Sequence, residues 1–112
     1  MTSAVIVGYV RSPFTPSNKG QLAKMRPDDI AVQVIQGLIK KTGVKVDDID
    51  DLIMGCAFPE GEQGFNIGRM VALQAGLPIT VAGSTINRWC GSSMEAIHIG
   101  AGNIGRGRGW VF

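Results

Sequence analysis

The chain has 112 residues, of which 45% are hydrophobic, so it can bury a core of its own. Leu, Ile, Val and Phe together exceed the fraction of about 20% below which chains remain disordered. Eleven basic and nine acidic residues leave a net charge of +2, which excludes the strongly basic surfaces typical of nucleic-acid or anionic-membrane binding. The length lies in the usual range of about 100 to 150 residues for one domain, which we expect to span residues 1–112.

Cysteine usage and the lack of a long apolar run indicate a cytoplasmic protein. Cys56 and Cys90 have neither the C-x-x-C spacing of a zinc site nor the density of a secreted disulfide scaffold, so we expect free thiols. No apolar run reaches the roughly 18 residues of a membrane span, and Met1 leads almost directly into a strand pattern. We therefore expect no membrane partner.

The first predicted element is a strand at residues 4–10. Its sequence, AVIVGYV, is a continuous apolar run typical of a strand that is covered on both faces in a parallel sheet. A polar loop rich in Pro and Ser follows at residues 11–20. Loops at the carboxyl end of such a strand commonly build functional sites.

A helix is predicted over residues 27–42. Pro27 suits its first position and Gly43 its end. Its apolar side chains are spaced by four residues and form one stripe, expected to pack on a sheet: Ile30, Val34 and Leu38, with Ala31, Ile35 and Ile39. A second strand run at residues 52–57 would complete a right-handed β-α-β unit.

The second half of the chain predicts two more helices and two more strands. Asn66 is expected to cap a helix with Ile67, Met70 and Val71 on its inner side, which Gly76 and Pro78 end. Residues 79–86 predict a third strand, and residues 109–112 the start of a fourth. Between these strands, residues at helical spacing predict a helix that begins sharply after a strand: Met94, Ile97, Ala101 and Ile104.

Cys90 lies where the third strand meets this helix. At a helix amino end, the dipole and free N–H groups favour a thiolate and can stabilise an oxyanion, so Cys90 is a candidate nucleophile. The alternative is a buried structural cysteine, because free cysteine is among the most buried residue types. The small neighbours Gly91 to Ser93 permit close approach of a substrate and leave the two interpretations about equal. Cys56, inside a strand run, is expected in the core.

The single histidine, His98, is not expected to activate Cys90. Eight residues along one helix correspond to about 12 Å of rise and ~80° of rotation. His98 is therefore interpreted as a surface or core-edge residue, and the chain lacks a complete Cys/His dyad.

Other motifs predict no cofactor or metal site. Residues 100–105 match G-x-G-x-x-G, but they end a helix instead of opening one after a strand, so we expect no dinucleotide site there. Residues 105–109, GRGRG, contain too few arginines to indicate nucleic-acid binding. The aspartates at positions 47, 48, 50 and 51 are expected to form a solvated turn. Cofactor-binding residues remain unknown.

The segment at residues 87–97, NRWCGSSMEAI, resembles the thiolases, the family of acetyl-CoA acetyltransferase and 3-ketoacyl-CoA thiolase. Their acylated cysteine lies in an N-x-x-C-x-S-G-x-x-A segment, and Ser93 stands where the family usually has glycine. Three further stretches are similar to family motifs in the same order: RSPF at 11–14, IDDLIMG at 49–55, and GFNIGR at 64–69 with AGLP at 75–78.

The resemblance implies an α/β fold, the amino-terminal half-domain of a thiolase, with a mixed, mostly parallel sheet flanked by helices and cut in its fourth strand. It implies that Cys90 attacks the 3-keto carbon of a 3-ketoacyl-CoA, releases acetyl-CoA and holds an acyl thioester until coenzyme A accepts it. The reverse is a Claisen condensation. Coenzyme A would be a co-substrate with no bound cofactor, and the full-length family forms homo-oligomers.

The family's G-H-P, C-x-G and N-E-A-F segments, which supply the base, the proton donor and a further motif, do not occur in these 112 residues. We therefore expect this chain alone not to be a competent thiolase. One alternative is a non-catalytic association module that acts through unpaired strand edges. Others are a relative of the ketoacyl synthases that act on carrier proteins, and a nucleotide-binding domain.

Overall fold

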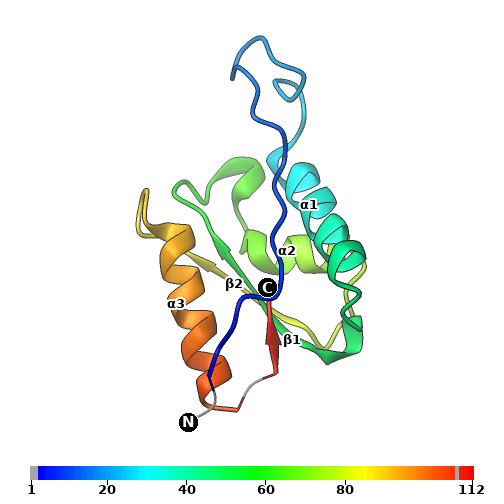
Figure 1. Cartoon of the computed structure of the whole chain (residues 1–112). Helices are drawn as coiled ribbons and strands as arrows, with labels where there is room; N and C mark the ends of the chain where they lie inside the picture. Colours follow the sequence, from blue (N-terminus) through cyan, green and yellow to red (C-terminus); the bar gives the residue numbers. More distant parts are fainter. Residues whose placement is uncertain (1–2, 108) are drawn as a thin grey trace.

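The computed structural model describes residues 3–107 and 109–112, which form three parallel strands flanked by helices (Figure 1). The main elements follow the chain as α1 (Pro27–Thr42), β1 (Ile49–Gly55), α2 (Ile67–Gln74), β2 (Ala82–Ile86), α3 (Ser92–Gly105) and β3 (Trp110–Val111). Two short 3₁₀ turns, Val46–Asp48 and Gly61–Gln63, precede β1 and α2. The predicted α/β class is therefore confirmed, and all strand pairs described are parallel.

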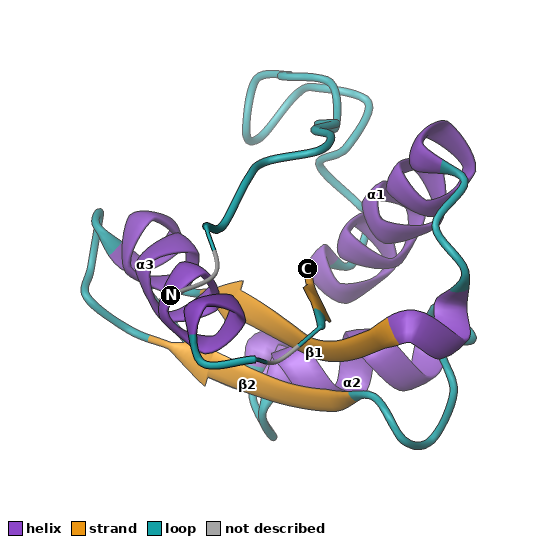
Figure 2. Cartoon of the chain, turned by 60° about the horizontal axis from the view of Figure 1, so that its bottom comes forward, coloured by secondary structure: helices purple, strands orange, loops and turns teal. Residues whose placement is uncertain are grey.

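The sheet order is β2-β1-β3, so β1 is the central strand. The chain moves outward from β1 to β2 and then returns past β1 to β3. Because crossovers between parallel strands are right-handed, this reversal places α2 and α3 on opposite faces of the sheet (Figure 2). Both strand–helix junctions after β1 and β2 then lie at one edge.

The main core lies between β1, β2, α2 and one side of α1. Val71 of α2 and Val81, just before β2, are completely buried, and Leu52 of β1 is 1% exposed. The cluster is made of eight buried apolar residues: Ile35, Ile49, Leu52, Ile67, Val71, Ala72, Leu77 and Val81. No helix in the described part of the chain is long and apolar enough to cross a membrane.

The predicted strand at residues 4–10 is wrong. The segment is extended but joins no sheet, and Val5 and Ile6 are 71% and 78% exposed. The segment runs past α1 (Figure 1). It is held there by Lys41, whose ammonium donates to the Tyr9 carbonyl oxygen at 2.8 Å and lies 4.4 Å from the Tyr9 ring centroid. Both sides of β1 are occupied by β2 and β3, and the segment does not pair with the outer edge of either.

The bounds of α1 are as predicted, but its packing is not. Gly43 adopts the left-handed conformation (φ 68°), and its N–H donates to the Ile39 carbonyl oxygen at 2.9 Å. The main contacts of α1 are with α2 and the Gly61–Gln63 turn, instead of with a sheet face. Since residues 4–10 form no strand, the predicted β-α-β unit around α1 does not exist, and only Ile35 of its apolar stripe is buried.

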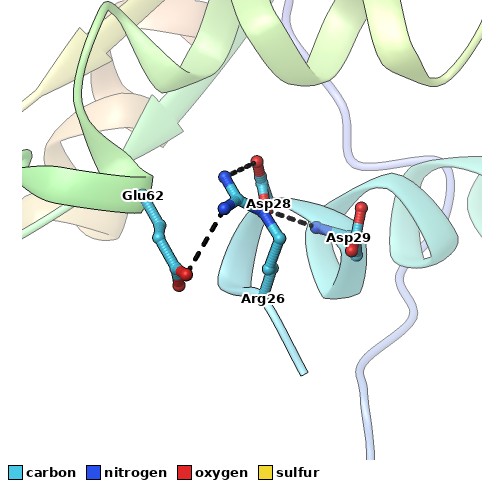
Figure 3. A network of polar contacts seen from close by, with 4 residues as sticks. All are labelled: Arg26, Asp28, Asp29 and Glu62. Carbon is cyan, nitrogen blue, oxygen red and sulfur yellow. Dashed lines mark hydrogen bonds and ion pairs between the residues drawn. The ribbon is translucent and has the colours of Figure 1, made fainter. Parts of the chain in front are cut away.

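The start of α1 is fixed by a network of charged side chains (Figure 3). Arg26 makes a bidentate pair with Asp28, at 3.0 Å and 2.9 Å, and also contacts Glu62 at 3.3 Å. The hydrogen bond from Arg26 lowers the pKa of the Asp28 carboxyl group, and the same bond raises the pKa of Arg26. The network joins α1 to the turn before α2.

Asn66 does not cap α2 in the predicted manner. It is left-handed (φ 55°) and makes no side-chain cap; instead its amide nitrogen donates to the Gly83 carbonyl oxygen at 2.9 Å. Its amide oxygen accepts the Thr85 hydroxyl at 2.8 Å. Asn66 thus ties the start of α2 to β2. Met70, expected on the inner side, is 40% exposed.

Close approach between α2 and β2 explains two of the glycines. A Cβ atom at Gly68 would lie 2.1 Å from the Ser84 carbonyl oxygen, and one at Gly83 would lie 2.5 Å from the Arg69 Cα atom. Real Cβ atoms do not approach so closely, so side chains at these positions would push helix and strand apart.

The buried face of α3 also differs from the expectation. Met94 and Ile97 are 59% and 52% exposed, whereas the buried positions are Ser92, Ala96 and Gly100. These small residues let the helix axis lie close to β1. Two other expectations are corrected: Asp51 is 6% exposed within β1, not in a solvated turn, and the third strand begins at Ala82, leaving Ile79 82% exposed.

Candidate functional site

Cys90 lies at the carboxyl edge of the parallel sheet. Gly55 and Ile86, the last residues of β1 and β2, are paired, so the segments that follow both strands leave the sheet side by side. After Ile86 the chain runs through residues 87–91 and enters α3 at Ser92. Crevices at the carboxyl ends of parallel strands are the usual place for sites in α/β folds.

The two cysteines have different environments. Cys90 is exposed, so the interpretation as a buried structural cysteine is not supported. Cys56 is half-buried and packs against the core cluster, as expected. Its N–H donates to the Ile86 carbonyl oxygen at 3.0 Å, which continues the β1–β2 ladder beyond the strand ends.

The residue before Cys90 has a rare backbone conformation. Trp89 is left-handed, with φ 51°, a region that costs a residue with a large side chain about 1–3 kcal/mol. Its N–H donates to the Asn87 side-chain oxygen at 3.0 Å, and its ring meets the Phe58 ring edge-on with 5.6 Å between centroids. The segment after β1 therefore supports the segment that carries Cys90.

Ser92 closes this segment from the helix side. Its hydroxyl donates to the Trp89 carbonyl oxygen at 2.6 Å and accepts the Arg88 N–H at 2.9 Å. Gly91 N–H donates to the Arg88 carbonyl oxygen at 3.0 Å, which makes the turn tight. Cys90 is thus held on a short, hydrogen-bonded turn directly before the positive end of the α3 dipole.

Gly55 allows the amino end of α3 to reach the sheet. A Cβ atom at Gly55 would lie 2.4 Å from the Ser93 backbone nitrogen and 2.6 Å from the Ser92 carbonyl carbon. Any side chain there would displace the turn that carries Cys90. The depth at which the turn sits on the sheet therefore depends on a bare backbone at the end of β1.

Charged side chains of the turn before α3 and of α3 itself pair with one another. Arg88 pairs with Glu95 at 3.2 Å, and the Glu95 carboxylate lies 4.0 Å from the Nδ1 atom of His98. The His98 side chain is 67% exposed, as expected for a surface helix residue. Among residues 3–107 and 109–112, no group of three or more His, Cys, Asp or Glu side chains could hold a metal ion.

The glycine motif at residues 100–105 forms the end of α3. Gly100 is buried, and a Cβ atom there would lie 3.3 Å from the Cγ1 atom of Val111, so the glycine serves the packing of α3 on β3. This placement agrees with the expectation that the motif ends a helix instead of opening one. Arg108 of the neighbouring GRGRG stretch lies outside the described residues.

Sequence reasoning singled out Cys90 but missed three residues that hold it. Asn87 and Ser92 occupy the N and S positions of the thiolase-like N-x-x-C-x-S segment. Their place in that motif could have indicated that they support Cys90. Phe58 carried no signal, because its contact with Trp89 joins two segments that are distant in the sequence.

Comparison with known proteins identifies the family. Residues 4–112 match the family model described as thiolase, N-terminal domain. A 3-ketoacyl-CoA thiolase of Saccharophagus degradans is 46% identical over 109 residues, which are 96% of this chain and 28% of that protein. The 3-ketoacyl-CoA thiolases of two Acinetobacter baumannii strains, ATCC 17978 and AYE, are 45% and 44% identical, with the same coverage. The chain spans about 28% of the length of these relatives and belongs to the thiolase family.

Proposed function

We propose that Cys90 is the acyl-accepting nucleophile of a thiolase-type acyltransferase that acts on acyl-CoA thioesters. The observation that carries this proposal is the exposure of Cys90 on a constrained turn at the amino end of α3, within the thiolase-like segment. The substrate class is supported by the relatives, which are named 3-ketoacyl-CoA thiolases.

In the proposed reaction, the Cys90 sulfur attacks the 3-keto carbon of a 3-ketoacyl-CoA. The bond between C2 and C3 breaks, its electron pair stays on C2, and protonation of that carbon releases acetyl-CoA. The sulfur of a second coenzyme A then attacks the acyl thioester, and the Cys90 thiolate leaves. Backbone N–H groups at the start of α3 would stabilise the oxyanion formed in each addition.

We propose that the 112-residue chain accepts an acyl group without turning over. Complete thiolysis needs a base for the thiol and an acid for the leaving carbanion, each of which contributes on the order of 10²- to 10⁴-fold. His98 is exposed on α3, and its Nδ1 atom lies 4.0 Å from the Glu95 carboxylate, so we assign it neither role. A cytoplasmic location remains a prediction.

A second candidate function, association without catalysis, is favoured by the exposed apolar surface. The accessible surface is 7597 Å², whereas a folded monomer of 11.9 kDa exposes roughly 5,950 Å² by the usual scaling. Contributors are Val5 and Ile6 before α1, and Met94 and Ile97 on α3. An exposed apolar surface of this kind is suited to docking onto another polypeptide chain.

Intact-mass measurement after incubation with acetyl-CoA or acetoacetyl-CoA tests the first proposal. We expect one acetyl group per chain, which Cys90→Ser abolishes and the matched control Cys56→Ser retains. No adduct, together with concentration-dependent association on a sizing column, would exclude the acyl-transfer proposal for this chain and support the second candidate.

A further inference from the structure

Ser92 is the only residue between Asn87 and Ser93 that is buried. It is 4% exposed, while the other residues of this segment are exposed. A hydroxyl group is buried at little cost only when it is hydrogen-bonded, and Ser92 uses its hydroxyl both as donor and as acceptor. Both partners belong to the turn that carries Cys90.

The two bonds enclose the left-handed residue. The hydroxyl accepts the N–H of Arg88, before Trp89, and donates to the carbonyl group of Trp89 itself. The Trp89 carbonyl also accepts the Ser92 N–H at 3.2 Å, so it keeps a partner without the hydroxyl. The Arg88 N–H has no other acceptor among the described residues, so loss of the hydroxyl would leave this group unpaired and remove two of the hydrogen bonds that hold the turn around Trp89.

The φ angle of Trp89 determines where Cys90 points. Rotation about this bond turns the whole of the following chain relative to the sheet, and Cys90 is the next residue. On the other side, the bare backbone of Gly55 lies against Ser92 and Ser93 and fixes the depth of the turn. Ser92 therefore controls the direction of the turn, while Gly55 controls its distance from β1.

We propose that Ser92 is a positioning residue, which keeps Trp89 left-handed and so aims the Cys90 thiol at an acyl-CoA. This inference rests on the proposed role of Cys90 as nucleophile. Ser92 itself touches neither the thiol nor the substrate in this role. Because a misplacement of about 1 Å can reduce a rate on the order of 100-fold, loss of the hydroxyl should reduce acyl transfer to Cys90 strongly.

The test compares the full chain with three variants: Ser92→Ala, Ser92→Thr and the control Ser84→Ala. Ser84 lies in β2, outside the turn, and its hydroxyl makes no hydrogen bond to another described residue. One readout is the NMR cross-peak between the amide and α protons of Trp89, which is strong only when φ is positive. The other is the rate of acetyl transfer from acetyl-CoA to Cys90.

We expect Ser92→Ala to lose the strong Trp89 cross-peak and to slow acetyl transfer by roughly 10- to 100-fold. Ser92→Thr should retain both signals, and Ser84→Ala should be unchanged. Circular dichroism verifies that each variant is folded; if Ser92→Ala is not, the inference still requires Ser92→Thr to match the wild type.

A Ser92→Ala protein that keeps the strong Trp89 cross-peak overturns the inference, whether or not its acetyl transfer is slower. If the wild type accepts no acetyl group, the proposed function fails. The cross-peak then still decides whether Ser92 sets the Trp89 conformation.

Discussion

The Ser92 hydroxyl donates a hydrogen bond of 2.6 Å to the carbonyl oxygen of Trp89, across the residue proposed as the nucleophile. Cys90 is therefore presented by a closed turn instead of a free loop. Gly55 of β1 approaches the same turn closely enough to exclude a side chain. The position of the Cys90 thiol thus depends on residues at the ends of β1 and β2 and in the first turn of α3.

Gly55→Ala should destabilise the protein by about 1–3 kcal/mol, because its Cβ atom would meet the backbone of Ser93. It should also slow acetyl transfer to Cys90, since the turn must move outward. Urea unfolding measures the first effect. Gly37→Ala is the matched control: it lies in α1 with open space around its Cβ position, and we expect it to stabilise the protein by about 0.5–1 kcal/mol. Equal effects of the two substitutions would show that Gly55 is not a site of close approach.

The Arg26–Asp28 pair should make the free energy of unfolding depend on pH in the acidic range. The lowered pKa of Asp28 means that the unfolded chain binds a proton at a higher pH than the folded chain. The pair's contribution is therefore complete above the unfolded value of about 3.9 and is lost as the pH falls through the folded value. The urea midpoints of both proteins are measured from pH 7 to pH 2.5. Below pH 4, the midpoint should fall less steeply for Asp28→Asn than for the wild type.

Asp47→Asn serves as the control for this titration, because Asp47 is an exposed residue of the Val46–Asp48 turn. Its acid profile should follow the wild type. A wild-type profile identical to that of Asp28→Asn would contradict a stabilising role of the pair.

Lys41→Met should release the segment at residues 4–10 from α1. The substitution removes both the hydrogen bond to the Tyr9 carbonyl and the contact with the Tyr9 ring. We expect faster proteolysis within this segment, while the unfolding midpoint changes little because the core does not include it. Lys40→Met, at the exposed neighbouring position, should leave the cleavage rate unchanged; a similar increase there would point to a general effect of charge.

Local signals in the sequence predicted the elements whose ends are determined locally. Pro27 and Gly43 bound α1 as expected, because first-turn proline and left-handed glycine act within a few residues. The turn from β2 into α3 around Cys90 was also visible, since strand and helix periodicities change there. The motif at residues 87–97 therefore pointed to a cysteine that the structure places, exposed, directly before α3.

Features that depend on distant partners were not predictable in this way. Residues 4–10 have the composition of a strand, yet a strand also needs a neighbouring edge, which the sequence pattern does not reveal. On α3 the pattern favoured Met94 and Ile97 as the buried face, whereas close packing on β1 selects the small residues Ala96 and Gly100. The Phe58–Trp89 contact depends on how two loops meet at the sheet edge.

The most direct test of the central claim compares acetyl transfer to Cys90 in the folded chain with transfer to the same cysteine in urea, each located by peptide mass mapping. If the turn and the α3 amino end activate the thiol, Cys90 should react at least about tenfold faster in the folded protein. The half-buried Cys56 should instead react more slowly when folded. A folded-state rate at Cys90 equal to or below its rate in urea would contradict the proposal that this fold presents Cys90 as an acyl-accepting nucleophile.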